Sequence, residues 1–166
     1  MIEIVEQAKQ QNVNQAPLGS DEKAICFPSV NTCLTVTTVG KDGKLSGLHL
    51  GMYMAPEGNS TDSRQIGEKD VDGYLNALKK KLDESGGADR IYIAGCVNMW
   101  QGTMPGILDR IRSTATSWAK EAGGKLEASI QFDDSDPSNE TVDIQVTQKG
   151  VKFISTKTKL EVPPET

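Results

Sequence analysis

The sequence predicts an α/β protein of the α+β kind, in which two main helices pack on a mixed β-sheet or β-sandwich core. Several short segments are rich in β-branched residues and alternate apolar with polar side chains, which is typical of strands. Two longer segments repeat apolar residues at helical spacing. Because these helical segments are set among many strand segments, we expect helices packed against a sheet.

The chain of 166 residues is long enough to bury one core, and we expect a single domain over residues 21–166. Residues 1–20 hold four glutamines and two asparagines, so we expect a polar leader or a short amphipathic helix there. The first strand of the domain is expected over residues 23–27, which are mostly apolar.

A β-hairpin is expected over residues 33–53, because two strand-like segments flank a short turn that contains two glycines. In a three-residue loop, Gly43 takes the left-handed conformation and Gly40 pairs with Lys44. In a two-residue loop, the pairing moves by one residue and the side chains of one strand turn to the other face. We take the three-residue loop as the prediction.

This loop places the only histidine of the chain near a cysteine. Thr35 then faces His49, and Cys33 faces Gly51. Cys33 and His49 become diagonal neighbours on one face of the hairpin, roughly 7–8 Å apart at the backbone. Gly47 and Gly51 flank His49 and leave room for a substrate backbone to approach.

The remaining elements follow from periodicity and from residues that begin or end helices. A helix is expected over residues 70–84, where a run of serine and glycine ends it. A second helix is expected over residues 105–122, because Pro105 suits a first turn and glycine follows the last residue. Further strands are expected over residues 90–96, 126–132, 141–147, 151–155 and 160–162.

Composition excludes several classes of function. A net charge of −5 gives no general affinity for nucleic acid or anionic membranes, and no apolar run is long enough for membrane insertion. Three scattered cysteines indicate a reducing compartment, with no disulfide framework and no metal site. We therefore expect a cytoplasmic protein without a cofactor, although the polar leader also permits delivery to a host cell as an effector. The composition does not indicate an oligomeric state.

Cys33 and His49 are the smallest set of residues here that can do covalent chemistry. A thiol is a weak nucleophile and a thiolate a strong one. An imidazole within hydrogen-bond reach can take the thiol proton and later return it to a leaving group. The alternative is that His49 is a packed histidine and Cys33 a small buried apolar residue.

These residues resemble those of the CheD family of chemotaxis receptor glutamine deamidases and of the related cytotoxic necrotising factor family. Both families place a nucleophilic cysteine at the start of a strand and a histidine on the adjoining strand, as Cys33 and His49 are placed here. Residues 93–100 look like the central strand of CheD and the run that follows it, and residues 152–160 look like its C-terminal hairpin. The resemblance covers roughly residues 20–163.

The resemblance implies hydrolysis of a glutamine side-chain amide in a protein substrate, giving glutamate and ammonia. Cys33 is then the nucleophile and His49 the base. CheD orients its histidine with a threonine where this chain has Phe27, so the backbone carbonyl of Phe27 is expected in that role, or the side chain of Ser29 or Thr35. The residues expected to contact substrate are Asn31, Thr32, Gly47, Gly51 and Asn98.

A second reading is a non-enzymatic protein-binding domain that keeps the CheD-like fold. The departures from CheD at Phe27 and at Asn31-Thr32 favour this reading, since they replace residues around the nucleophile. Residues 98–101 follow the central strand and are expected either at a pocket rim or in packing. Cys26 and Cys96 are expected to be buried and inert.

Overall fold

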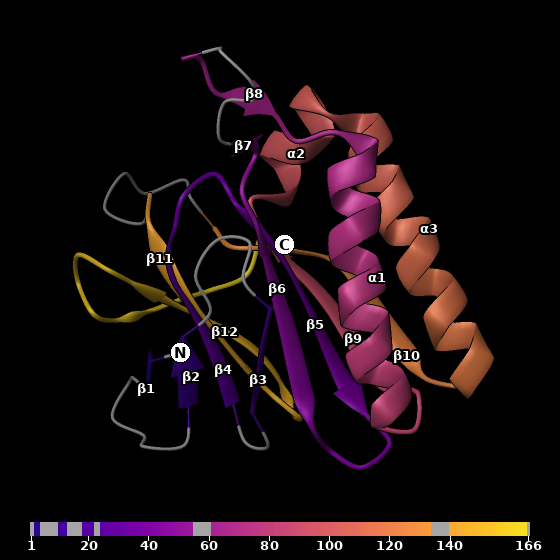
Figure 1. Cartoon of the computed structure of the whole chain (residues 1–166). Helices are drawn as coiled ribbons and strands as arrows, with labels where there is room; N and C mark the ends of the chain where they lie inside the picture. Colours follow the sequence, from indigo (N-terminus) through magenta and orange to yellow (C-terminus); the bar gives the residue numbers. More distant parts are fainter. Residues whose placement is uncertain are drawn as a thin grey trace.

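The computed structural model of the chain describes residues 2–3, 10–12, 18–21, 24–54, 61–133 and 140–165. These residues form three layers, with helices on one side, a five-stranded sheet in the middle and a six-stranded sheet on the other side (Figure 1). Helices packed on a mixed-sheet core are what the sequence predicts, and that class is confirmed. Within the described ranges, no helix has the length and apolar character needed to cross a membrane.

The middle sheet consists of β3 (Leu18–Asp21), β5 (Leu34–Gly40), β6 (Leu45–Leu50), β9 (Ala88–Gly95) and β10 (Lys125–Gln131). Its strand order is β10-β9-β5-β6-β3, and its only parallel pair among the described strands is β9 with β10. Every residue of β5 and β6 is buried, so both faces of the sheet are covered at its centre.

The β5–β6 hairpin has the predicted loop and register. Thr35 pairs with His49. The N–H of Gly40 donates to the carbonyl of Lys44 at 2.8 Å, and the N–H of Gly43 donates to the carbonyl of Gly40 at 2.9 Å. Gly43 has a φ of 87°, a conformation that glycine adopts without steric cost. The three-residue loop is therefore confirmed.

The second arm of the hairpin is shorter than predicted. We expected it to reach residue 53, but β6 ends at Leu50. The carbonyl of Met52 accepts the N–H of Ile66 at 2.8 Å, so the chain leaves the middle sheet here. It continues as β7 (Tyr53–Met54), which pairs with β8 (Arg64–Gln65).

Two long helices, α1 (Glu68–Glu84) and α3 (Pro105–Ala122), cover one face of the middle sheet (Figure 1). α1 begins two residues earlier than predicted. The carboxylate of Asp70 accepts the N–H of Gly67 at 2.9 Å and so satisfies a donor at the helix start. α3 has the predicted bounds, since Pro105 begins it and Gly123, with a φ of 67°, ends it.

The chain passes from β9 to the parallel strand β10 through α2 (Val97–Thr103) and then α3. The sequence did not predict α2, because seven residues are too few to show a helical repeat. Trp100 anchors α2 in the core, where its side chain is fully buried. Its indole N–H donates to the carbonyl of Thr32 at 2.8 Å, which ties α2 to the segment before β5.

The outer sheet has the order β1-β2-β4-β11-β12-β13, with β4 spanning Ala24–Val30, β11 Val142–Thr147 and β12 Gly150–Ser155. The short flanking strands are β1 (Ile2–Glu3), β2 (Gln10–Asn12) and β13 (Glu161–Val162). A helix within residues 1–20 is wrong for the part of this segment that the structure describes. There β2 runs beside β4 and β3 runs beside β6, so backbone pairing with the two sheets keeps the chain extended.

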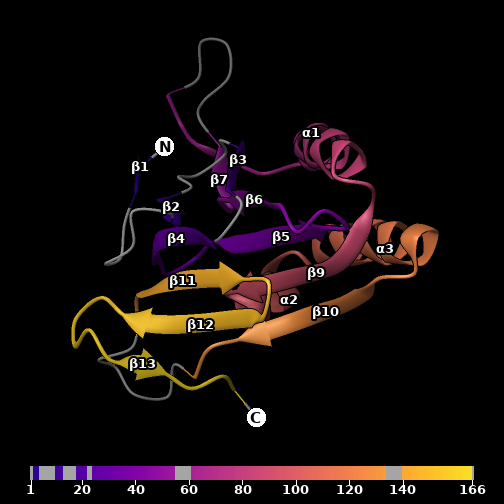
Figure 2. The same cartoon turned by 90° about the horizontal axis from the view of Figure 1, so that it is seen from below.

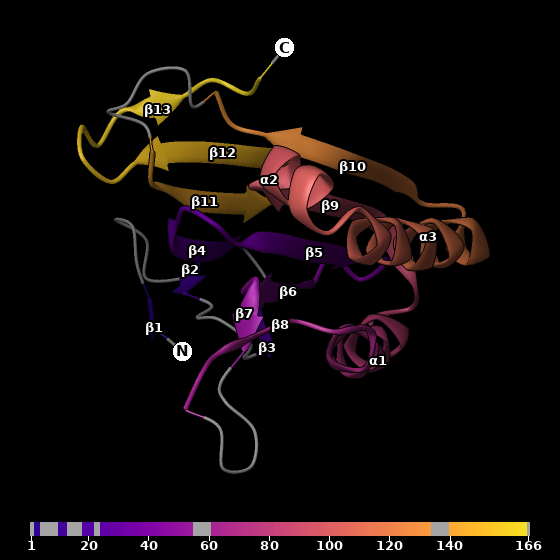
Figure 3. The same ribbon diagram turned by 90° about the horizontal axis from the view of Figure 1, so that it is seen from above.

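The two sheets pack face to face, as the views along the layers show (Figures 2 and 3). The fit is close at Gly47 of β6, where a Cβ would lie 2.7 Å from the ring of Phe27. Farther along the interface, the Tyr92 hydroxyl lies 3.5 Å from the carbonyl of Gln148, which follows β11. The face of the middle sheet that carries His49 is therefore turned toward the outer sheet.

Candidate functional site

Cys33 lies directly before β5, at the end of the hairpin opposite its loop. Its side chain is 1% exposed. Its carbonyl accepts the N–H of Cys96 at 3.0 Å. Gly95 has a φ of 130°, and a Cβ there would lie 2.7 Å from the carbonyl oxygen of Cys33. The backbone at Cys33 is thus held by close contacts with the end of β9.

His49 lies in β6 and is 3% exposed. Its ring meets the ring of Phe27 edge to face, with centroids 5.6 Å apart and planes at 87°. Phe27 belongs to β4, where it pairs with Ile144 of β11. The Phe27 ring packs against the imidazole in this contact, and the orienting role of the Phe27 backbone carbonyl stays a prediction.

Thr35 lies directly across the hairpin from His49 and is fully buried. Its hydroxyl donates to the carbonyl of Ala94 at 2.9 Å. Because this bond uses the hydroxyl hydrogen, the Thr35 oxygen can only accept from any further partner. An acceptor facing an imidazole suits the orienting role expected for Thr35.

The face shared by Thr35 and His49 carries several polar side chains into the interface between the two sheets. Side chains alternate along a strand, so Cys33, Thr35 and Thr37 belong to one face in the predicted pattern. Thr35 and Thr37 have no exposed surface. Ser29, the other side chain expected to orient His49, lies near the end of β4 and is exposed. Buried polar side chains are more informative about function than exposed ones, because each needs a specific partner.

The two glycines beside His49 have different surroundings. The space at Gly47 is filled by Phe27 and Ile25 of β4, so the room we expected there for a substrate belongs to the core. Gly51 is half-buried and lies just beyond β6, in the bend before β7. The ladder ends at the pair Leu34–Leu50, so the expected pair of Cys33 with Gly51 lies one position outside it.

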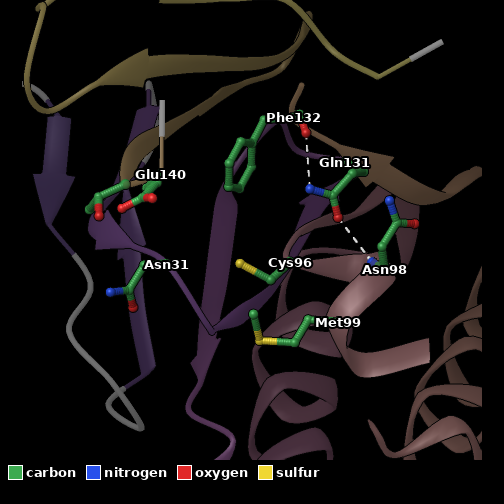
Figure 4. Close-up of a pocket in the computed structure, with 8 residues that line it drawn as sticks. Asn31, Cys96, Asn98, Met99, Gln131, Phe132 and Glu140 are labelled. Atoms are coloured by element: carbon green, nitrogen blue, oxygen red, sulfur yellow. Dashed lines mark hydrogen bonds between the residues drawn. The ribbon is translucent and has the colours of Figure 1, made fainter. Parts of the chain in front are cut away.

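A pocket of about 400 Å³ lies between Asn31 and Cys96 (Figure 4). Two residues expected to contact substrate, Asn31 and Asn98, line it. Thr32, which is also expected to contact substrate, follows Asn31, and its backbone carbonyl accepts the Trp100 indole N–H. The described lining residues are Asn31, Cys96, Asn98, Met99, Gln131, Phe132, Glu140 and Thr141.

The position of this pocket follows from the chain topology. Cys96 follows the last residue of β9, and Gln131 is the last residue of β10. The two strands are parallel, and ligand sites in such units lie at the carboxyl ends of the strands. The described lining does not include Cys33 or His49. Cys33 lies close to the pocket for two reasons. Asn31, two residues earlier, lines the pocket, and the Cys33 carbonyl accepts the N–H of Cys96, which lines it too.

Hydrogen bonds fix two amide side chains in the pocket wall. The Gln131 amide donates to the carbonyl of Phe132 at 2.9 Å, and its oxygen accepts the backbone N–H of Asn98 at 3.0 Å. The Asn98 side-chain amide donates to the carboxylate of Glu165 at 2.7 Å. This bond uses one of the two N–H donors of the Asn98 amide, whose oxygen is an acceptor.

The sequence predicts Asn31 and Asn98 at the site, and Met99 as part of residues 98–101. The pocket residues that it does not predict are Cys96, Gln131, Phe132, Glu140 and Thr141. Cys96 is buried, as predicted, with 4% of its surface exposed, and it lines the pocket. Its lack of reactivity stays a prediction. A signal for these residues was present, since Cys96 and Gln131 end two strands that a helical segment connects. That pattern predicts a parallel pair with its binding end at these residues.

Cys26, the remaining cysteine, lies outside the pocket. Cys26 in β4 is fully buried. Burial, together with the nearby Asp143 carboxylate, raises the pKa of the Cys26 thiol to about 12. Among the described residues, no group of three histidine, cysteine or acidic side chains is arranged to hold a metal ion.

Comparison of the sequence with known protein families and with curated proteins finds no match. The roles of the site residues are therefore argued from the register of the hairpin, from burial and from the pocket.

Proposed function

We propose that this protein is a cysteine-dependent amidohydrolase that converts glutamine side chains of a protein substrate to glutamate, with Cys33 as nucleophile and His49 as base. The observation that carries the proposal is the hairpin register. Thr35 faces His49, so Cys33, two residues before Thr35, is the diagonal neighbour of His49. A base within side-chain reach is what a cysteine nucleophile requires.

In the proposed reaction, His49 takes the proton of the Cys33 thiol, and the thiolate attacks the carbonyl carbon of the glutamine carboxamide. Backbone N–H groups of residues 31–33 stabilise the oxyanion of the tetrahedral intermediate. Protonated His49 gives its proton to the departing nitrogen, and ammonia leaves a thioester on Cys33. Water, deprotonated by His49, then hydrolyses the thioester to glutamate and restores the thiol. Thr35 acts as the acceptor that orients the His49 ring.

The pocket beside Asn31 and Cys96 supports the proposal because it gives a substrate a place to bind next to the nucleophile. The segment of Asn31 to Cys33 is held on both sides, by Trp100 at Thr32 and by Cys96 at Cys33. A backbone fixed in this way is suited to present N–H groups to a developing negative charge without reorganisation.

The test is ammonia release from a blocked Gln-Gly dipeptide and from glutamine-containing protein digests, with mass spectrometry to detect conversion of glutamine to glutamate. Cys33→Ser and His49→Ala are each expected to lower the rate by a factor on the order of a thousand or more, because the pair acts as one unit. Cys26→Ala serves as the matched control, since Cys26 lies outside the site, and it should keep the rate within about threefold.

Two results would overturn the assignment. Full activity in His49→Ala would show that His49 only packs against Phe27. Activity that survives Cys33→Ser but is lost in Cys96→Ser would move the nucleophile into the pocket, where Cys96 lies.

One observation favours a second function, that of a non-catalytic binding domain. Cys33 and His49 are 1% and 3% exposed, and the described pocket is lined by other residues. In that case the pocket binds a partner and neither side chain takes part in chemistry. A thiol-directed reagent at neutral pH separates the two functions. If Cys33 is the activated nucleophile, it is alkylated and the protein loses activity in proportion. If Cys33 is only packed in the core, it stays unmodified.

A further inference from the structure

The pocket at the carboxyl ends of β9 and β10 has a lining that selects for one kind of ligand. Its polar described residues are Asn31, Asn98, Gln131, Glu140 and Thr141, and no lysine, arginine or histidine is among them. Glu140 is exposed and is the only ionisable carboxylate of the described lining. A site of this composition offers an anion no charged partner and offers a cation one carboxylate.

The hydrogen bonds within the wall limit what the two amides can offer a ligand. Each amide uses one of its two N–H donors within the protein, Asn98 on the Glu165 carboxylate and Gln131 on the carbonyl of Phe132. An amide oxygen has two lone pairs, so the Asn98 oxygen and the second lone pair of the Gln131 oxygen can each accept a hydrogen bond from a ligand. Together with the Glu140 carboxylate, these oxygens suit a donor group with several N–H bonds.

The apolar part of the lining suits a flat group. The side chains of Cys96, Met99 and Phe132 lie between Glu140 on one side and Asn98 and Gln131 on the other (Figure 4). A guanidinium is planar, stacks on aromatic and apolar surfaces, and carries five N–H donors in a fixed fork. An ammonium group is compact and more strongly hydrated, so it gains less from this surface.

We propose that this pocket binds the guanidinium of an arginine side chain in the protein partner, with Glu140 as its counter-charge and the oxygens of Asn98 and Gln131 as further acceptors. The proximity of the pocket to Cys33 places this arginine near the target glutamine in the partner sequence. That last step rests on the proposed function, whereas the preference of the pocket for arginine does not.

Three blocked peptides test the proposal: Gly-Arg-Gly-Gln-Gly-Arg-Gly, the same peptide with citrulline at both arginine positions, and the same peptide with glutamate there. Citrulline keeps the shape of arginine and lacks the charge, so it is the matched ligand control. Binding is followed by NMR on the Cys33→Ser protein through the side-chain amides of Asn31, Asn98 and Gln131. Arginine peptide is expected to bind at least about tenfold more tightly than either control, and more weakly as salt is raised.

Glu140→Gln is expected to remove most of the preference for arginine over citrulline. The matched protein control is Glu84→Gln, which removes the same charge from an exposed site at the end of α1. That end of α1 contacts the hairpin loop at the far end of β5 from Cys33, where the N–H of Asp42 donates to the carbonyl of Ser85. Glu84→Gln should leave the arginine preference unchanged.

The outcomes separate this proposal from the proposed function. Equal binding of the arginine and citrulline peptides, or an arginine preference that persists in Glu140→Gln, overturns the arginine pocket. Deamidation of all three peptides at the same rate would also overturn the arginine pocket, although it would support the proposed enzyme. Arginine-specific binding without deamidation of any peptide keeps the pocket and overturns the enzyme.

Discussion

Gly95 is the residue on which the backbone at the candidate nucleophile most directly depends. Its φ of 130° lies in a region that side chains rarely adopt, and its missing Cβ leaves space for the carbonyl of Cys33. We expect Gly95→Ala to lower the free energy of unfolding by about 1–3 kcal/mol, through backbone strain and displacement of Cys33. Urea denaturation followed by circular dichroism measures this change.

Gly73 provides the control for Gly95. It lies on the exposed side of α1, and a Cβ there meets nothing within 4 Å. Gly73→Ala should therefore raise the free energy of unfolding by about 0.5–1 kcal/mol, because alanine has the higher helix propensity. If the two variants shift the unfolding midpoint in the same direction, the close approach at Gly95 has no energetic consequence.

The three cysteines should differ in reactivity, and Cys26 gives the sharpest expectation. With a pKa of about 12, its thiol remains protonated at pH 7, and the thiolate is the form that reacts. We expect iodoacetamide to leave Cys26 unmodified in the folded protein and to modify it fully after denaturation in urea. Peptide mapping by mass spectrometry reads both states. Rapid labelling of Cys26 in the folded protein would contradict its burial in β4.

At the level of elements, the hairpin was predictable because its register depends on local sequence. Gly43 takes the positive φ that closes a three-residue loop, and Gly40 pairs with Lys44 on either side of it, so the loop length is decided by residues close together in the sequence. The end of β6 was not predictable from the same residues. It depends on the hydrogen bond from the N–H of Ile66 to the carbonyl of Met52. No pattern in the sequence predicts that these two segments meet. Helix α2 was missed because a seven-residue helix lacks a full apolar repeat.

The start of α1 has a pH dependence that can be measured. The Asp70 carboxylate accepts two bonds from Arg64, at 2.7 and 3.1 Å, and one from the N–H of Gly67. The Arg64 bonds, then the Gly67 bond, hold the pKa of Asp70 at about 2, below the value near 3.9 of an unfolded aspartate. A lowered pKa stabilises the fold above the unfolded value, and this contribution is lost as the pH falls through the folded value.

Asp70→Asn should therefore lower the free energy of unfolding by about 1 kcal/mol at neutral pH, from the loss of the charge at the helix start and of the Arg64 ion pair. The difference from the unchanged protein should shrink between about pH 4 and pH 2. Asp109→Asn on the exposed face of α3 is the control and should change stability by less than about 0.5 kcal/mol. A difference that stays constant down to pH 2 would show that the charge of Asp70 is not involved.

For the whole molecule, the sequence predicts the class of fold better than the place of the pocket. The pocket brings together residues near positions 31, 96–99, 131–132 and 140–141. The packing of α2 against the strand ends and the pairing of β4 with β11 make them neighbours, and both are long-range contacts. The polar face of β5 is a similar case. Thr35 and Thr37 alternate with apolar residues, which is also typical of a half-exposed strand, and the outer sheet buries them.

The short strands near the N-terminus cover strands that could otherwise pair with other molecules. β3 runs along β6 and β2 runs along β4, so each covers a row of backbone N–H and C=O groups at the margin of a sheet. A chain that lacks residues 1–21 would present both rows to other molecules, and such rows are templates for strand addition and aggregation. We expect light scattering to show concentration-dependent self-association of the shortened chain beyond that of the full chain. If both chains have the same apparent mass at every concentration, these strands do not guard the sheets against intermolecular pairing.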